Sequence, residues 1–391
     1  MSRLNKIFFG PAGTGKTREA NIEAVRLVCE SKELKKYKFN KNDYRTIQKN
    51  LKDFSKLSEI SDKANDKIIE KIQNLSLSVD SVVNTLTFND IKALVGNGND
   101  RDKAKKNIAE YRIYPLIEMI TFHPSYSYQD FVEGISVETN KETNDIEYKV
   151  KDGIFKKICD RAENNPDYNY VLIIDEINRG DIASIFGELF TLLEDNKRKG
   201  NDEELGINLP YSKDEKGNPK KLFVPKNLYI LATMNTVDKS IALIDVALRR
   251  RFDFIECMPQ YKLFELKSIN KVDLSKLLET MNQRITILKN EHYQIGHSYF
   301  LNINNMDELR EVMIKKVIPL LQEYFYDDWK SICAVLHQSY QNPKNNGLLI
   351  KKEINKKLFE SEFDELFAYT NKTIFEINKE FSEEDIKKVY E

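Results

Sequence analysis

The sequence predicts an α/β fold with a parallel sheet core, a helical insertion and a helical C-terminal domain. Three observations predict it. The apolar run Ile7-Phe8-Phe9 leads into a glycine-rich phosphate-binding pattern, and further apolar runs at 170–174 and 228–233 end in polar residues. Beyond Pro259, apolar residues recur at helical spacing. Continuous apolar runs of this length are typical of strands buried in a parallel sheet.

The glycine-rich pattern fits the phosphate-binding loop G-x-x-x-x-G-K-[ST] at every position. Its glycines permit backbone angles and close approaches at which successive N–H groups can point at phosphate oxygens. Lys16 supplies a positive charge for the outer phosphates, and the Thr17 hydroxyl is placed to hold Mg²⁺. Helical spacing from Arg18 to Glu30 predicts a helix whose N-terminus faces the phosphates. The expected nucleotide-binding residues are Gly10, Pro11, Ala12, Gly13, Thr14, Gly15, Lys16 and Thr17.

Polar residues follow both later apolar runs. Asp175 and Glu176 end the first run. Next to a phosphate loop, an acidic pair of this kind has two expected roles. Asp175 orients the Mg²⁺ shell. Glu176 polarises the attacking water as general base. Asn235 and Asp238 follow the other run, where an amide and a carboxylate beside the terminal phosphate would position water or sense hydrolysis.

Three adjacent arginines follow a short helix expected at Leu243–Leu248. One interpretation is a solvated C-terminal turn favoured by the helix dipole. The other applies to a ring of nucleotide-binding subunits, in which such arginines reach a neighbour's phosphates and supply charge in trans. Both interpretations can hold for different arginines, and Arg249 and Arg250 are the candidates for the second.

Other segments receive simpler predictions. Aromatic and hydroxyl residues crowd the loop His123–Gly134, which either faces a ligand at the sheet edge or is a turn held by its tyrosines. Composition does not separate these alternatives. The remaining expectations are a strand at Ile117–Phe122, a hairpin within Glu138–Lys151, a helix at Gly153–Ala162, one helix with apolar positions from Ile182 to Leu193, and an exposed loop or hairpin over Lys197–Lys226.

We expect residues 1–258 to form the nucleotide-binding domain and residues 259–391 an α-helical lid. The nucleotide-binding domain contains an insertion at about 31–112 that is rich in Lys, Asn, Asp and Ser. Its interleaved acidic residues favour a solvated helical face over a nucleic-acid surface. In the lid, His297 is expected to pack or to hydrogen-bond rather than to bind metal. The expected lid helices are Leu274–Lys289, Met306–Tyr324 and Asp364–Lys379.

Bulk properties narrow the class of protein. The chain of 391 residues is 41% hydrophobic and 31% charged, which indicates a soluble globular protein. A net charge of −1 gives no global basic field for nucleic acid. Four scattered cysteines without a C-x-x-C pair indicate reduced thiols. No signal peptide precedes the loop and no apolar stretch reaches the length of a membrane helix, so we expect a cytoplasmic protein without membrane contact.

Taken together, the motifs resemble the McrB family of AAA+ proteins. The order of strand, phosphate loop, acidic strand end, asparagine strand end, arginine turn and helical lid is that of AAA+ proteins. The resemblance covers Leu4 to about Trp329 apart from the insertion. The segments that carry it are Phe122–Phe131, Ile173–Arg179, Met234–Ser240, Asp245–Phe252 and Ile295–Phe300.

The resemblance implies a GTP-hydrolysing motor subunit of a type IV, modification-dependent (5-methylcytosine-specific) restriction system. It implies a homo-oligomeric ring, a hexamer in this family, and an McrC-like partner that carries the nuclease. DNA would be engaged through the complex. Asn235 and Asp238 would act in hydrolysis with the partner's help. The preference for GTP over ATP rests on the resemblance alone, since spacing does not separate guanine from adenine.

Two departures from the family pattern are visible. Lys239 stands where the family often has Arg, and no separate DNA-binding domain precedes the phosphate loop. Either the sequence is the motor part alone, or target recognition lies in another subunit. A third possibility is that the insertion recognises the target. Two other classes remain open: a MoxR- or dynein-like AAA+ remodelling ATPase acting on protein partners, and a nucleotide-gated scaffold. The intact Asp175, Glu176 and arginines speak against the scaffold.

Overall fold

The computed structural model describes residues 4–51, 66–95, 100–139, 145–237, 246–264, 268–341, 347–352 and 374–391. The chain forms two compact units. The first comprises Met1–Phe9, Lys16–Met234 and Asp238–Glu256. The second comprises Gly10–Gly15, Asn235–Val237 and Cys257–Glu391. The phosphate-loop residues 10–15 therefore belong to the same unit as the C-terminal helices.

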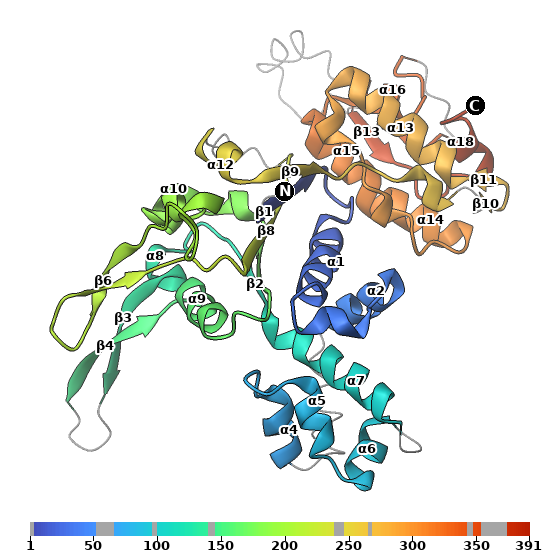
Figure 1. Cartoon of the computed structure of the whole chain (residues 1–391). Coiled ribbons are helices and arrows are strands. Elements are labelled where there is room, and N and C mark those ends of the chain that lie inside the picture. Colours follow the sequence, from blue (N-terminus) through green and yellow to red (C-terminus); the bar gives the residue numbers. More distant parts are fainter. Residues whose placement is uncertain are drawn as a thin grey trace. The chain divides into compact units, whose positions relative to one another are not determined.

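A five-stranded sheet with the order β2-β5-β8-β1-β9 forms the core of the first unit (Figure 1). The β2–β5, β5–β8 and β1–β9 pairs are parallel. Every residue of β5 before Asp175 is buried, as in a strand covered on both faces. The predicted α/β fold with a parallel sheet core is confirmed. The strands are β1 Asn5–Gly10, β2 Ile117–Thr121, β5 Tyr170–Asp175, β8 Leu228–Asn235 and β9 Asp253–Glu256.

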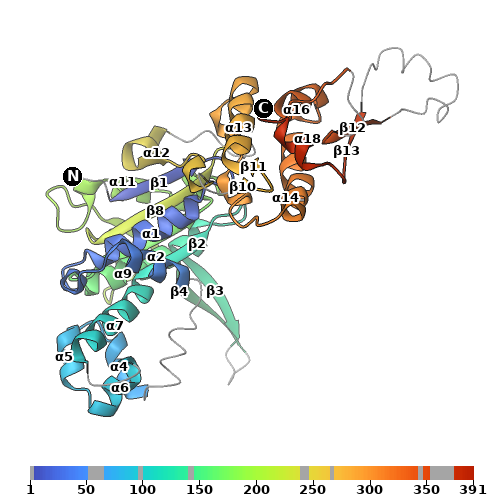
Figure 2. The same cartoon turned by 90° about the vertical axis from the view of Figure 1, so that its right-hand side faces the viewer.

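Two helices pack on strand β5 of the sheet. Helix α1 (Lys16–Cys29) begins at the lysine of the phosphate loop and buries Ala20, Ala24 and Val28. It packs on β5, and so does α9 (Ile154–Asn164). Figure 2 shows α1 against the sheet. Both helices were predicted from the sequence, and both are confirmed to within two residues.

The insertion is helical, as predicted. Its last helix, α7, carries the fully buried Arg112. The Arg112 guanidinium donates to the carbonyls of Ile72 at 2.9 Å and Asn74 at 3.0 Å, and to the Tyr168 hydroxyl at 2.7 Å. These bonds tie α4 and the following turn to α7 and to the segment before β5. The described elements are η1 Leu34–Tyr37, α2 Lys41–Asn50, α4 Asp66–Gln73, α5 Val79–Asn84, α6 Phe88–Val95, α7 Arg101–Ile113 and η2 Tyr114–Leu116.

Two antiparallel hairpins extend the first unit. Strands β3 (Glu133–Thr139) and β4 (Ile146–Asp152) form the first, which confirms the hairpin predicted within residues 138–151. Strands β6 (Ile207–Lys213) and β7 (Pro219–Leu222) form the second. Glu133 is fully buried, and its carboxylate accepts the backbone N–H of Tyr211 at 2.7 Å. This bond joins β3 to β6, and Figure 1 shows the two strands side by side.

The hairpin predicted within Lys197–Lys226 is confirmed by β6 and β7, but the expected exposure is wrong at the start of this segment. Arg198 is fully buried, and its guanidinium donates to Asn5 Oδ1 at 2.7 Å and to the Leu228 carbonyl at 3.1 Å. Burial lowers the pKa of Arg198 to about 10, so the side chain is charged at neutral pH and depends on these acceptors. A long-range partnership of this kind is invisible in local composition.

The single helix predicted from Ile182 to Leu193 is also wrong. The structure has two short helices, α10 (Ile182–Phe186) and α11 (Leu189–Leu192). They are separated at Gly187, whose φ of +48° lies outside the right-handed helical region. The apolar spacing runs through the break, which is why periodicity alone did not reveal it. Short elements elsewhere in this unit are α8 Tyr128–Phe131, η3 Ile177–Arg179, η4 Asp195–Lys197 and α12 Val246–Arg251.

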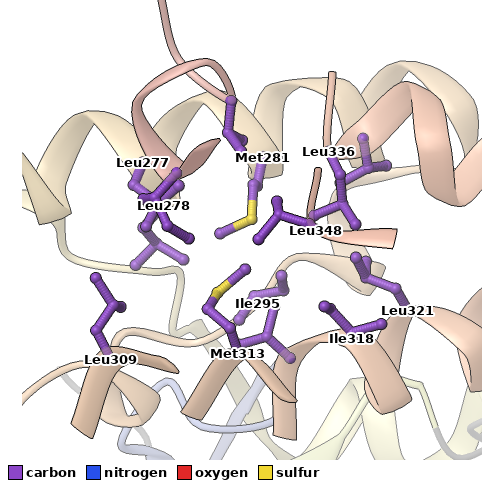
Figure 3. Close-up of a cluster of buried hydrophobic side chains, with 14 of the residues drawn as sticks. Leu277, Leu278, Met281, Ile295, Leu309, Met313, Ile318, Leu321, Leu336 and Leu348 are labelled. Atoms are coloured by element: carbon purple, nitrogen blue, oxygen red, sulfur yellow. The ribbon is translucent and has the colours of Figure 1, made fainter. Parts of the chain in front are cut away.

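The C-terminal part of the second unit is mainly helical, as predicted for a lid. Helices α14 and α15 are joined by a π-helical stretch, so the segment predicted as one helix from Met306 is continuous. Figure 3 shows Leu277 and Met281 facing Met313 across the core of this unit. Its helical elements are η5 Tyr261–Phe264, α13 Leu274–Leu288, η6 Glu291–Tyr293, η7 His297–Tyr299, α14 Met306–Val312, η8 Met313–Val317, α15 Ile318–Phe325, α16 Trp329–Val335 and α18 Glu383–Lys387.

The helix predicted over Asp364–Lys379 is wrong where it can be compared. Residues 374–377 form strand β13 (Ile374–Ile377), which pairs antiparallel with β12 (Leu349–Lys352). Isoleucine and phenylalanine favour strands, and Phe375 is buried. Residues 364–373 lie outside the described part. A second short hairpin joins β10 Ser268–Ile269 to β11 Val272–Asp273.

Within the described residues, no helix combines the length and the apolar character that crossing a bilayer requires.

Candidate nucleotide-binding site

The acidic end of β5 is bonded to the helix that follows the phosphate loop. Asp175 Oδ1 accepts a hydrogen bond from the Thr17 hydroxyl at 2.9 Å. Lys16, the residue before Thr17, is only 9% exposed. Two residues 158 positions apart in sequence thus share one site, because the chain crosses the sheet and returns to it in parallel strands. The structure brings together the two motifs that sequence analysis paired.

Glu176 leaves the strand through a strained turn. Its φ is +53° and its ψ +48°, a left-handed conformation that costs a non-glycine residue about 1–3 kcal/mol. Its backbone N–H donates to the Thr233 hydroxyl at 3.1 Å. The Arg179 guanidinium lies 3.5 Å from the Glu176 carboxylate. Strain retained at the residue predicted as general base is typical of a functional position.

Thr233 is a site residue that sequence analysis missed. It is 2% exposed near the end of β8, and its hydroxyl donates to Asp175 Oδ1 at 2.5 Å. The same hydroxyl accepts from Glu176, so one side chain fixes both carboxylate residues. The sequence offered one signal, a hydroxyl residue at the end of an otherwise apolar run. In the structure, this run forms the strand that pairs with β5.

Replacing Thr233 by valine keeps the shape of the side chain and removes the hydroxyl. Hydrogen bonds to charged groups contribute about 1.5–3 kcal/mol, so we expect a fall in kcat of about tenfold or more. Steady-state hydrolysis at saturating nucleotide measures this effect. The matched control is Thr191→Val, an exposed threonine of α11. Equal rates for the parent and Thr233→Val would exclude a positioning role for this hydroxyl.

In the second unit, the phosphate loop has the backbone conformation that its glycines were predicted to provide. Gly13 and Gly15 have φ values of +76° and +81°. A Cβ on Gly10 would lie 2.3 Å from the Cys257 carbonyl oxygen, so no other residue fits there. The Thr14 hydroxyl donates to the Pro11 carbonyl at 2.9 Å and closes the turn.

A lid segment packs directly on this loop, a contact that sequence analysis did not predict. The N–H groups of Gly296 and Ser298 donate to the carbonyls of Ala12 and Gly13 at 3.1 and 3.0 Å. A Cβ on Gly296 would lie 2.1 Å from the Gly13 carbonyl carbon. Burial raises the pKa of the neighbouring Tyr299, which therefore stays protonated. The lid thus contributes two backbone bonds to the loop that is expected to hold phosphates.

Of the two residues predicted to act beside the terminal phosphate, Asn235 and Asp238, the structure describes Asn235. Asn235 is the last residue of β8, and its side-chain oxygen accepts from the Val237 N–H at 3.4 Å. The next residue, Thr236, donates its N–H to the Gly10 carbonyl at 3.2 Å, so the strand end contacts the phosphate loop. Asp238 lies outside the described residues.

The three arginines of α12 separate into two kinds. Arg251 is held inside the first unit, with its guanidinium 2.7 Å from the Glu194 carboxylate. Its carbonyl accepts from the Asn5 side chain at 3.0 Å. Arg249 and Arg250 are exposed. A structural role therefore fits Arg251, whereas the other two are available to a neighbouring molecule.

The aromatic loop after β2 proves to be a packed turn. Phe122 stacks on Tyr126 at a ring separation of 5.0 Å and meets Phe131 edge-on at 5.8 Å. Phe122 and Phe131 are fully buried, and burial raises the pKa of Tyr126 to about 12. Of the two interpretations of this loop, the geometry favours the turn held by its aromatic residues.

The donor set at the acidic strand end fits Mg²⁺. The Thr17 hydroxyl and the Asp175 carboxylate offer hard oxygen ligands, which Mg²⁺ prefers. Their separation of 2.9 Å matches adjacent corners of an octahedron whose metal–oxygen distances are about 2.1 Å. Among the described residues, no three His, Cys, Asp or Glu side chains cluster to form an all-protein metal cage. A metal shared with phosphates and water is therefore the compatible arrangement.

Comparison with known proteins supports the same assignment. The family model for the McrB α-helical lid domain matches residues 273–333, and that for the AAA domain of the dynein-related subfamily matches residues 103–252. The McrB subunit of a type IV methyl-directed restriction enzyme from Escherichia coli K12 is 35% identical over 230 residues. The chain is an AAA+ protein of the McrB type.

A second relative is the YdiS component of the type II restriction enzyme BsuMI from Bacillus subtilis 168, 34% identical over 112 residues. The E. coli alignment covers 54% of this chain and 48% of the relative, and the B. subtilis alignment covers 28% and 33%. The McrB-type chain therefore spans about half the length of the first relative and a third of the second. A solved structure of a Cytophaga hutchinsonii protein covers 76% of this chain and 64% of its own, with 14% identity and a TM-score of 0.25, too low to support an argument.

Proposed function

We propose that this McrB-type chain is the GTP-hydrolysing motor subunit of an McrBC-like restriction complex. The observation that carries the proposal is the hydrogen bond between Thr17 and Asp175, which unites the phosphate loop's hydroxyl with the acidic strand end. The two relatives are a subunit and a component of restriction enzymes, which supports the biological setting. The McrB lid match supports an McrB-type motor over other AAA+ classes.

The chain's own residues would divide the work of hydrolysis. Lys16 and the backbone N–H groups of the loop bind the outer phosphates and hold the terminal one in place. Glu176 accepts a proton from the attacking water, and Thr233 fixes the turn from which Glu176 projects. Mg²⁺, held by Thr17 and Asp175, would neutralise phosphate charge when bound.

Residues near the strand end and on α12 would complete the site. Asn235 and Asp238 are proposed to orient the water or to sense the terminal phosphate. Arg249 and Arg250 are proposed to act in trans on a neighbouring subunit's nucleotide, which requires a closed ring of copies. Their exposure in the single chain is consistent with this use.

The finer parts of the proposal rest on the resemblance to McrB. These are the preference for GTP over ATP, a hexameric ring, an McrC-like nuclease partner, and DNA translocation by the complex. The insertion gives limited support to direct DNA binding, because its half-buried Lys105 and Lys106 pair with Asp80 at 2.7 Å and Asp43 at 3.2 Å.

Phosphate release from GTP and ATP, each with Mg²⁺ and with or without a co-expressed nuclease subunit, tests the proposal. We expect GTP turnover that the partner stimulates, with little turnover of ATP. Hydrolysis of ATP alone would overturn the GTP assignment and leave the triphosphatase intact. Stimulation by a protein substrate rather than by a nuclease partner would favour a remodelling ATPase.

A further inference from the structure

The lid segment that packs on the phosphate loop contains a buried histidine. His297 is 4% exposed and begins the short helix η7 (His297–Tyr299). The residues on either side of it, Gly296 and Ser298, donate their N–H groups to the loop carbonyls of Ala12 and Gly13. The imidazole is therefore fixed against the loop from both sides, within one compact unit.

One hydrogen bond determines which ring nitrogen carries the proton. The backbone N–H of Gln260 donates to His297 Nδ1 at 3.2 Å. Because Nδ1 accepts, the neutral ring has its proton on Nε2. Of the ring atoms, Nε2 lies nearest to the position that a Cβ on Gly15 would occupy, at 3.7 Å. The ring thus presents an N–H donor to the loop residue immediately before Lys16.

We propose that His297 is a nucleotide-contacting residue whose Nε2–H donates to a phosphate oxygen held at Gly15. The proposal rests on the proposed function in one respect, namely that residues 10–17 bind a nucleoside triphosphate. It adds a lid side chain to the backbone N–H groups of residues 10–15, which belong to the same unit. Phosphate binding would then be coupled to the lid through a side chain as well as through the two backbone bonds.

Two substitutions separate a phosphate contact from a packing role. One keeps an acceptor in place of Nδ1, and the other keeps a donor in place of Nε2. In His297→Asn, the amide oxygen can still accept from Gln260, but no donor reaches the position of Nε2. In His297→Gln, the longer side chain places an amide N–H near the position of Nε2 and loses the acceptor at Nδ1. His337→Asn, at an exposed lid histidine, is the matched control.

The measurement is the dissociation constant of a non-hydrolysable GTP analogue with Mg²⁺ for the full chain, accompanied by the Tm without nucleotide. We expect His297→Asn to bind about tenfold more weakly than the parent, because it loses a hydrogen bond to a charged oxygen. His297→Gln, which restores a donor, should bind at least about fivefold more tightly than His297→Asn. His337→Asn should match the parent. Equal affinities of the two His297 variants, or weaker binding by His297→Gln, would overturn the proposal. Failure of the parent to bind any nucleotide would instead overturn the proposed function.

Discussion

Replacing Glu176 by glutamine is expected to lower kcat for nucleotide hydrolysis by about 10²–10⁴-fold while leaving nucleotide affinity nearly unchanged. Glutamine has the same shape as glutamate, but it cannot accept a proton from water at neutral pH. Binding should persist because we propose that the phosphates contact the loop, Lys16 and the metal rather than this side chain. Single-turnover hydrolysis and equilibrium binding, measured on the same preparation, separate the two effects.

The control for this substitution is Glu163→Gln, an exposed glutamate on α9 that pairs with Lys199. It should hydrolyse nucleotide at the parental rate, because surface ion pairs contribute about 0–1 kcal/mol to stability and this pair lies outside the site. Parental turnover by Glu176→Gln would exclude Glu176 as the general base. Loss of binding in that variant would instead indicate that its strained turn supports the loop.

We expect one of the two exposed arginines, Arg249 or Arg250, to act in trans as an arginine finger. Replacing that arginine by alanine should lower turnover by about 10³-fold. Folding should be little affected, because both side chains are exposed. Arg251→Ala should behave differently and lower stability, since it breaks the ion pair with Glu194. Turnover and Tm of the three single variants measure this contrast.

A mixing experiment shows whether the arginine acts between subunits. Equal amounts of Arg250→Ala and Glu176→Gln, each nearly inactive, should recover about one quarter of parental activity, because random mixing in a ring makes about one interface in four complete. The same experiment applies to Arg249→Ala. No recovery with either arginine variant, despite mixed assembly, would place the required arginine within its own subunit or outside the reaction.

Local sequence patterns predicted the parts of the site whose geometry is local. The phosphate loop and the paired carboxylates of β5 depend on residue types at fixed spacing, and Asp175 lies at the end of a strand as the apolar run predicted. The contact of Gly296 with Gly13 could not be predicted, because it joins segments more than 280 residues apart and leaves no periodic signal. Thr233 was similarly hidden within an otherwise apolar strand.

The errors in the fold have the same origin. Apolar spacing predicted one helix where Gly187 separates two, because periodicity does not report a positive φ. At Ile374–Ile377, pairing with β12 outweighs the helical spacing of the apolar residues, so this segment is a strand. The buried partnership of Arg198 with Asn5 likewise depends on long-range packing that composition does not encode.

The most direct test is a structure of the Glu176→Gln chain with GTP and Mg²⁺ bound. We predict the metal about 2.1 Å from the Thr17 hydroxyl oxygen, with Asp175 in its shell directly or through one water. Lys16 Nζ should lie about 2.7–2.9 Å from an oxygen of the terminal phosphate. Nucleotide bound away from residues 10–17, or a terminal phosphate out of reach of Lys16 and Asp175, would contradict a triphosphatase site at this strand end.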